Sequence, residues 1–184
     1  MESDGRLIAR LKDGDGQALQ ALYARHNVKI YRFVLRLIRD EGAAEDVVSE
    51  VFIDLWRNPA AFEGRSEAST WLMAIARNKA WSLLRKRKEA EIDEGSLEAI
   101  ADESDDPEVE MQKKTKAELL RACLAKLSAE HREVIDLVYY HEKSIEDVAA
   151  IIGIPEGTVK TRMFHARKKL SDIARAAGVD RGWP

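Results

Sequence analysis

The chain of 184 residues carries 30 Lys and Arg against 33 Asp and Glu, a net charge of −3 that gives no sign of nucleic-acid binding. A charged fraction of 34% beside a hydrophobic fraction of 45% is typical of a soluble, helix-rich globular protein. The single cysteine excludes an internal disulfide framework, no apolar run is long enough to span a membrane, and the acidic N-terminus is unlike a secretory signal, so we expect a cytoplasmic protein with no membrane contact of its own.

Residues 1–88 form the first predicted unit. We expect it to be helical throughout, because its apolar residues recur at i, i+3, i+4 and i+7. Asp-Gly turns, Pro59 and a cap formed by Ser69 or Thr70 divide the unit into segments. The segments are a short helix around Leu7–Leu11 and longer helices over about 17–39, 44–57 and 71–88.

Residues 89–110 contain 11 acidic and no basic residues, and they lie between two segments that are each mildly basic. This stretch has few large apolar residues and no aromatic one, so it buries too little surface to offset its ordering entropy. It is predicted to be a flexible acidic linker. Two interpretations stay open, a solvated spacer and an acidic strap that competes with DNA for the basic segments.

Residues 111–177 form the second predicted unit, and 178–184 form a short tail. Ser128 and Ser144 are suited to cap helices, Gly153 ends a short helix, and Pro155 lies at the start of the next. No alternating strand pattern of useful length occurs in the chain. The predicted fold class is therefore all-α, with two small helical domains joined by the acidic linker.

A short helix, a Gly-containing turn and a second helix over about 156–170 fit a helix-turn-helix. The second helix combines a buried apolar stripe with a basic outer side, which suits the major groove of duplex DNA. A helical hairpin with a solvated basic face is the alternative. The residues predicted to face DNA are Thr158, Lys160, Thr161, Arg162, Phe164, His165, Arg167 and Lys168.

Two features of the first unit call for a partner. Asp46, Glu50 and Asp54 recur at i, i+4 and i+8 opposite a complete apolar face, so this acidic edge suits a basic surface, with an ordinary solvated face as the alternative. The helix over 71–88 interleaves tryptophans with Lys and Arg, which suits the unstacked bases of a single strand. Tryptophans at helical spacing also occur as core residues, and that interpretation stays open for Trp71.

Three segments resemble motifs of bacterial sigma factors. Asp46–Trp56 resembles the segment that binds core RNA polymerase, Thr70–Asn78 resembles the −10 element segment, and Gly157–Arg162 resembles the start of the −35 recognition helix. Two domains and a short linker, with these motifs in this order, resemble the extracytoplasmic-function (ECF) group of the sigma-70 family.

The resemblance implies an alternative sigma factor that binds core RNA polymerase, at the clamp helices of the largest subunit and the flap of the second-largest. It would recognise −35 duplex and single-stranded −10 DNA, help to melt the promoter, and be controlled by an anti-sigma factor. The implied core-binding residues are Asp46, Ser49, Glu50, Asp54 and Trp56. The implied −10 residues are Arg65, Ser66, Trp71, Arg77, Asn78, Lys79, Trp81 and Arg85. The sequence departs from many relatives at Ser49, where Gln is common, and at His165, where Arg is frequent.

The second interpretation is a stand-alone helix-turn-helix transcriptional regulator, and a third is a helical interaction protein that touches no DNA. Enzymatic activity is not expected, because the four histidines are scattered and no phosphate-cradling glycine motif occurs. The sequence implies no cofactor and no metal site.

Overall fold

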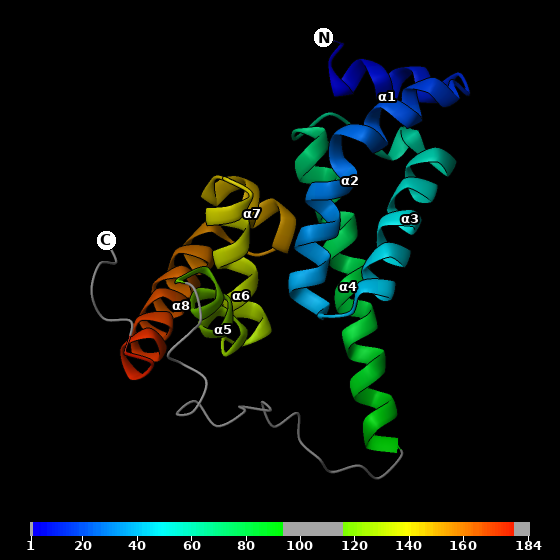
Figure 1. Cartoon of the computed structure of the whole chain (residues 1–184). Coiled ribbons are helices and arrows are strands. Elements are labelled where there is room, and N and C mark those ends of the chain that lie inside the picture. Colours follow the sequence, from blue (N-terminus) through cyan, green and yellow to red (C-terminus); the bar gives the residue numbers. More distant parts are fainter. Residues whose placement is uncertain (1, 94–115, 179–184) are drawn as a thin grey trace.

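The computed structural model describes residues 2–93 and 116–178, and every regular element within these ranges is a helix (Figure 1). The predicted all-α fold class is therefore confirmed for these ranges. None of the helices described combines the length and the apolar character needed to cross a membrane. The predicted linker lies outside the described residues from Glu94 onward, so its proposed flexibility and its competition with DNA stay predictions.

The first unit holds α1 (Asp4–Lys12), α2 (Gly16–Ile38), α3 (Glu41–Arg57), the short 3₁₀ helix η1 (Pro59–Ala61) and α4 (Ala68–Asp93). Its first three helices begin where a capping side chain accepts a hydrogen bond from a backbone N–H two or three residues further on. These caps are Ser3, Asp15 and Asp40.

Both ends of α4 differ from the prediction. The helix begins at Ala68, so Ser69 and Thr70 lie inside its first turn, where their hydroxyls bond to the second unit. It also runs past Lys88 to Asp93, because Glu and Ala in this stretch are good helix formers. The predicted start of the linker at Glu89 is therefore helical.

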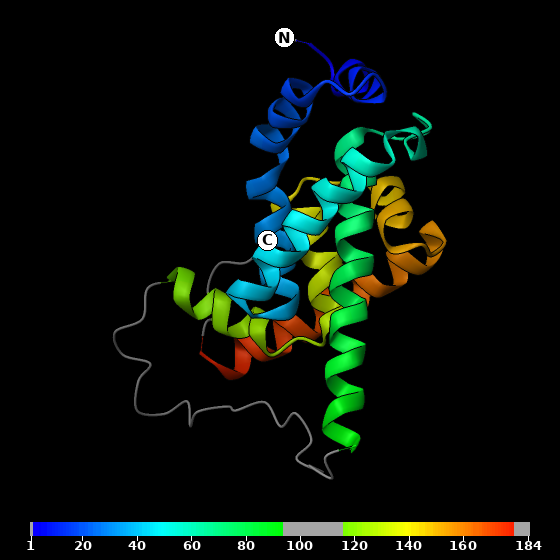
Figure 2. The ribbon, with the colours of Figure 1, turned by 90° about the vertical axis from the view of Figure 1, so that its right-hand side faces the viewer.

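Apolar side chains of α2, α3 and α4 form the core of the first unit, and Figure 2 shows these helices side by side. Ile30 and Phe33 of α2, Leu55 of α3 and Leu72 of α4 belong to this core, and all four are almost completely buried. This packing fixes which side of α3 and of α4 faces solvent.

The second unit holds α5 (Lys116–Ala125), α6 (Ala129–Ile135), the π-helical turn η2 (Asp136–Tyr140), α7 (Ile145–Ile152) and α8 (Glu156–Ala176). Ser128 accepts a hydrogen bond from the His131 N–H at 3.3 Å and caps α6 as predicted. Val134 of α6 and Val159 of α8 are fully buried where these two helices pack together, and Leu137 of η2 is fully buried beside α6 and α7. Cys123 is buried, and burial raises the pKa of its thiol.

Removal of the α7 cap is expected to lower stability by a modest amount. The Ser144 hydroxyl accepts a hydrogen bond from the Asp147 N–H at 3.0 Å, which is the predicted cap. We expect Ser144→Ala to lower the free energy of unfolding by about 1 kcal/mol. Urea denaturation measures the change, and Ser144→Thr, which keeps the oxygen, should lose less. Equal stability of the alanine variant and the wild type would show that the cap contributes nothing.

Candidate nucleic-acid interface

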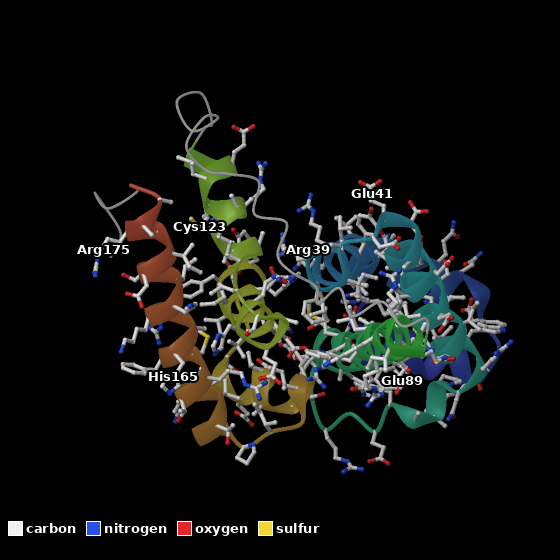
Figure 3. The ribbon with its side chains drawn as sticks, turned by 90° about the horizontal axis from the view of Figure 1, so that it is seen from below. Arg39, Glu41, Glu89, Cys123, His165 and Arg175 are labelled. Atoms are coloured by element: carbon white, nitrogen blue, oxygen red, sulfur yellow. The ribbon has the colours of Figure 1, made fainter. Side chains whose placement is uncertain are left out.

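The pair α7–α8 forms a helix-turn-helix. Gly153 ends α7 in the left-handed region at φ 76°, and Pro155 precedes the first residue of α8. A side chain is strained at that φ, so glycine allows the tight turn between the two helices. Val159 and Met163 are buried against the unit, which leaves the opposite side of α8 free. Figure 3 shows His165 on this outer side.

The outer face of α8 is basic and exposed, as predicted. Phe164 is 63% exposed, with the His165 ring edge-on at a centroid distance of 5.5 Å. The Lys160 ammonium lies 3.7 Å from Glu156 one turn earlier, and both side chains remain largely exposed. The other exposed positions on this face are Thr158, Thr161, Arg167, Lys168 and Lys169. This surface therefore has the shape and charge to enter a major groove.

Two of the residues predicted to contact DNA from α8 already form contacts within the protein. Arg162 is only 20% exposed, and its guanidinium lies 3.7 Å from Glu130 of α6, so it turns back toward its own unit. The Thr161 hydroxyl donates to the Gly157 carbonyl at 3.0 Å, although the side chain stays exposed. Neither contact was foreseen from the sequence, since both depend on neighbours across a turn or across helices.

The acidic edge on α3 is present, but it contains a cation. Asp46, Glu50 and Asp54 share the outer side of α3, and Lys79 of α4 lies 3.1 Å from Glu50 and 2.7 Å from Asp54. Burial opposes the charge of Lys79, but hydrogen bonds to Asp54 and Glu50 outweigh it and raise the pKa of Lys79 above its ordinary value. Three carboxylates against one ammonium leave the edge negative. Lys79, predicted to face DNA, instead belongs to this edge.

The remaining predicted core-binding residues lie on the same helix. Trp56 is 42% exposed and Ile53 is 45% exposed, so an apolar patch continues the acidic edge. The Ser49 hydroxyl donates to the Glu45 carbonyl at 3.0 Å within the helix. An acidic edge with an exposed tryptophan suits a basic protein surface that also offers apolar contact.

One face of α4 carries three of the predicted −10 residues. Trp71, Asn78 and Arg85 follow one another at i, i+7 and i+14, a spacing that places them on the same side of a helix. Asn78 and Arg85 are exposed, while Trp71 is half-buried with its ring 5.4 Å from the Phe62 ring. Arg65 and Ser66 lie in the loop before α4, and Arg65 pairs with Glu63.

The neighbouring face of α4 is occupied. Arg77 and Trp81 both donate hydrogen bonds to the carboxylate of Glu133 in α6. The Thr70 hydroxyl donates to the carboxylate of Asp147. Burial raises the pKa of Asp147, but hydrogen bonds from Ser144 and Thr70 and the charge of Lys143 together hold this pKa below its ordinary value. No sequence pattern indicated the role of Glu133. No group of three or more His, Cys, Asp or Glu suited to a metal ion occurs among residues 2–93 and 116–178.

Comparison with known proteins identifies the family. The Sigma-70 region 2 family matches residues 22–90, and the Sigma-70, region 4 family matches residues 117–170. The chain is 35% identical to the ECF RNA polymerase sigma factor SigL of Mycobacterium tuberculosis, over 89% of this chain and 92% of that protein. It is 31% identical to the ECF RNA polymerase sigma-E factor of Escherichia coli, over 92% and 93% of the two chains.

Two solved structures share the fold. The sigma factor RpoE of Bartonella quintana, in complex with the anti-sigma factor NepR, matches with a TM-score of 0.68 and 28% identity over 85% of this chain and 96% of that one. CnrH, in complex with the cytosolic domain of CnrY, matches with a TM-score of 0.69 and 26% identity over 95% and 99%.

The chain belongs to the sigma-70 family and to its ECF group. It is an alternative sigma factor, as the sequence predicted. The family to which it belongs consists of non-enzymatic factors for transcription initiation. A stand-alone helix-turn-helix regulator accounts for the match over 117–170 but leaves the match over 22–90 without an explanation.

Proposed function

We propose that three separate surfaces carry three steps of transcription initiation. The acidic edge of α3 docks on the clamp helices of the largest subunit of core RNA polymerase. The start of α4, with the loop before it, binds the non-template strand of the −10 element. The outer face of α8 recognises −35 duplex DNA. Residues 1–88 would thus serve polymerase and the −10 element, and residues 111–177 would serve the −35 element and the flap of the second-largest subunit.

The exposed outer face of α8 is the observation that carries this proposal. Most of its side chains are basic or polar, and they project from a helix whose opposite side is buried in the unit. Lysine and arginine neutralise phosphates and donate to guanine, whereas a threonine hydroxyl bonds to either type of base. A purely structural helix needs no such concentration of donors on its solvent side.

The −10 step needs a pocket for an unstacked base. The rings of Phe62 and Trp71 already lie against each other, tilted by 58°, near the start of α4. Asn78 lies on the same helix face as Trp71 and is exposed to solvent. Removing a base from the stack costs a few kcal/mol, which aromatic contact and a side-chain amide are suited to offset. Arg85, further along this face, suits the phosphates of the same strand.

An anti-sigma factor is part of the proposal. The sigma factors of the two similar structures are bound to NepR and to the cytosolic domain of CnrY. Since this chain matches both over most of its length, we infer that its activity is also controlled by a protein of that class.

Run-off transcription with core RNA polymerase on a genomic promoter library tests the function. We expect specific transcripts only when this chain and core enzyme are both present, from templates that share −35 and −10 elements. A gel shift with and without core enzyme tests the rival: tight promoter binding by the chain alone, without directed transcription, would support a stand-alone regulator.

A further inference from the structure

The two units pack against each other through the side of α4 that carries Arg77 and Trp81. Contacts join α4 to α7 and α2 to α6, and Figures 1 and 2 show the second unit alongside these two helices. Ser69 and Thr70, at the start of α4, also bond to Lys143 and Asp147. Part of the surface proposed for −10 DNA is thus an internal contact of the free chain.

Glu133 is the centre of this contact. Its side chain is completely buried, and its carboxylate accepts hydrogen bonds from Arg77 Nε at 2.7 Å and from Trp81 Nε1 at 2.9 Å. A second guanidinium nitrogen of Arg77, Nη2, lies 3.4 Å from the other carboxylate oxygen. The Arg77 side chain is only 18% exposed as a result.

A carboxylate held in this way occupies donors that also suit a nucleic-acid phosphate. The planar guanidinium presents paired N–H groups that match carboxylate and phosphate oxygens alike. The Trp81 ring N–H can donate to one acceptor at a time. A DNA strand on this face of α4 therefore competes with Glu133 for the same hydrogen bonds.

A second pair of charges supports the same arrangement. Asp136 of η2 is 4% exposed and forms an ion pair with Arg36 of α2, while its other oxygen lies 3.2 Å from His141 Nε2. There are thus two places, Glu133 with Arg77 and Asp136 with Arg36, where a buried acid of the second unit pairs with an arginine of the first unit. Removing one partner of such a buried pair destabilises the packed arrangement, whereas separation of the units returns both charges to water.

We propose that the free chain has a closed conformation in which Glu133 takes the place of a DNA phosphate on α4, so that binding of the −10 strand requires α6 to leave α4. This inference rests on the proposed role of α4. The closure is selective, because Lys160 and Phe164 of α8 remain 66% and 63% exposed. Glu50 of the acidic edge is also 60% exposed. Closed molecules could thus meet −35 DNA and core polymerase while their −10 surface is occupied.

The test is Glu133→Gln in the full chain. Glutamine keeps the shape of the side chain but removes the charge that Arg77 faces, so the closed conformation loses its central pair. Because the affinity of a site scales with the fraction of molecules that expose it, we expect binding of a fluorescein-labelled random-sequence single strand of about 12 nucleotides to tighten by about tenfold. Amide hydrogen exchange in α4 and α6 should accelerate.

Two further variants complete the test: the first is a control, and the second weakens the same contact between the units at another position. Glu146→Gln removes an exposed charge of the same sign from α7 and should leave strand affinity and amide exchange at wild-type values. Asp147→Asn weakens the Thr70 and Lys143 contacts without altering Arg77 or Trp81, and should tighten strand binding in the same direction by a smaller factor. It also keeps the test valid if Glu133→Gln folds poorly. Affinity for a double-stranded pool of the same length should change little in all three.

Each outcome decides between the proposals. Strand binding of equal affinity by wild type and by well-folded Glu133→Gln and Asp147→Asn variants would overturn the closed conformation alone. Unchanged amide exchange in both variants would do the same. Faster exchange in α4 and α6 with no strand binding by any variant would instead overturn the assignment of α4 to the −10 strand, and the role of Glu133 as a competitor with it.

Discussion

Replacing Asp46 and Glu50 together by lysine is expected to abolish binding to core RNA polymerase while the fold stays intact. Both side chains are exposed on α3, and its apolar face is already complete against α2 and α4. The reversal turns an attractive edge into a repulsive one, and like charges placed together across an interface cost several kcal/mol. A loss of at least a hundredfold in affinity, about 3 kcal/mol, is therefore expected.

Lys79 makes this prediction sharper. Lys79 already pairs with Glu50 and Asp54. In Glu50→Lys, the ammonium groups of Lys79 and of the new lysine therefore lie near the one carboxylate that is left, that of Asp54. Affinity for core enzyme is measured by competition with a labelled sigma factor, and helicity and the urea midpoint establish that the variant is folded. Asp13→Lys with Glu41→Lys makes the same change in charge at exposed positions outside the edge and should bind normally. Wild-type affinity of a folded Asp46→Lys, Glu50→Lys variant would remove the acidic edge from the docking proposal.

Helix ends were predictable where one residue decides them. Ser128 and Ser144 cap α6 and α7, and Gly153 ends α7 in the left-handed region, as expected from the sequence. These are local effects, in which a side chain bonds to backbone within three residues or a missing Cβ allows a positive φ. The extension of α4 to Asp93 was not predicted, because the strong negative charge of residues 89–110 masked the helix propensity of their first residues.

Which face of α4 each basic residue occupies was not predictable. The sequence assigned Arg77, Lys79 and Trp81 to DNA alike, since all lie on one basic, aromatic helix. Helix α4 packs against α3 on one side and against α7 on another, and it reaches Glu133 of α6 through side chains, so these residues have different partners. Lys79 reaches the acids of α3, whereas Arg77 and Trp81 reach Glu133.

Buried charges between the units were the largest omission. A sequence gives no reason to expect Glu133 and Asp136 inside the protein, because charged side chains are almost always exposed unless paired. Their partners, Arg77 and Arg36, lie 56 and 100 residues away in the chain. His141 is interior as well, since only 4% of its side chain is exposed and its ring lies edge-on to Phe33. Only the packing of the two units makes these positions interior.

Two lysines of α8 are expected to contribute to DNA binding in different ways. Lys160 lies in the first turns of the helix, where a recognition helix presents side chains to base edges, and Lys168 lies about two turns further on. Both are exposed, so burial does not distinguish them, but position along the groove does. Lys160→Ala should therefore cost about 1–3 kcal/mol at −35 elements and change which sequences are preferred. Lys168→Ala should weaken binding to all sequences alike and reduce the salt dependence by about one counterion.

A randomised −35 selection with reconstituted holoenzyme, together with affinities at several salt concentrations, measures both effects. The two lysine variants serve as controls for each other, because each loses one exposed lysine from the same helix and both have the same net charge. Thr161→Ala provides a third case. Its hydroxyl already donates to the Gly157 carbonyl at 3.0 Å and retains only acceptor capacity for a base, so its loss should change the preferred −35 motif less than the loss of Lys160 does. If Lys160→Ala keeps the wild-type motif and Lys168→Ala changes it, the helix enters the groove by its C-terminal half, and the assignment of base and phosphate contacts along α8 must be reversed.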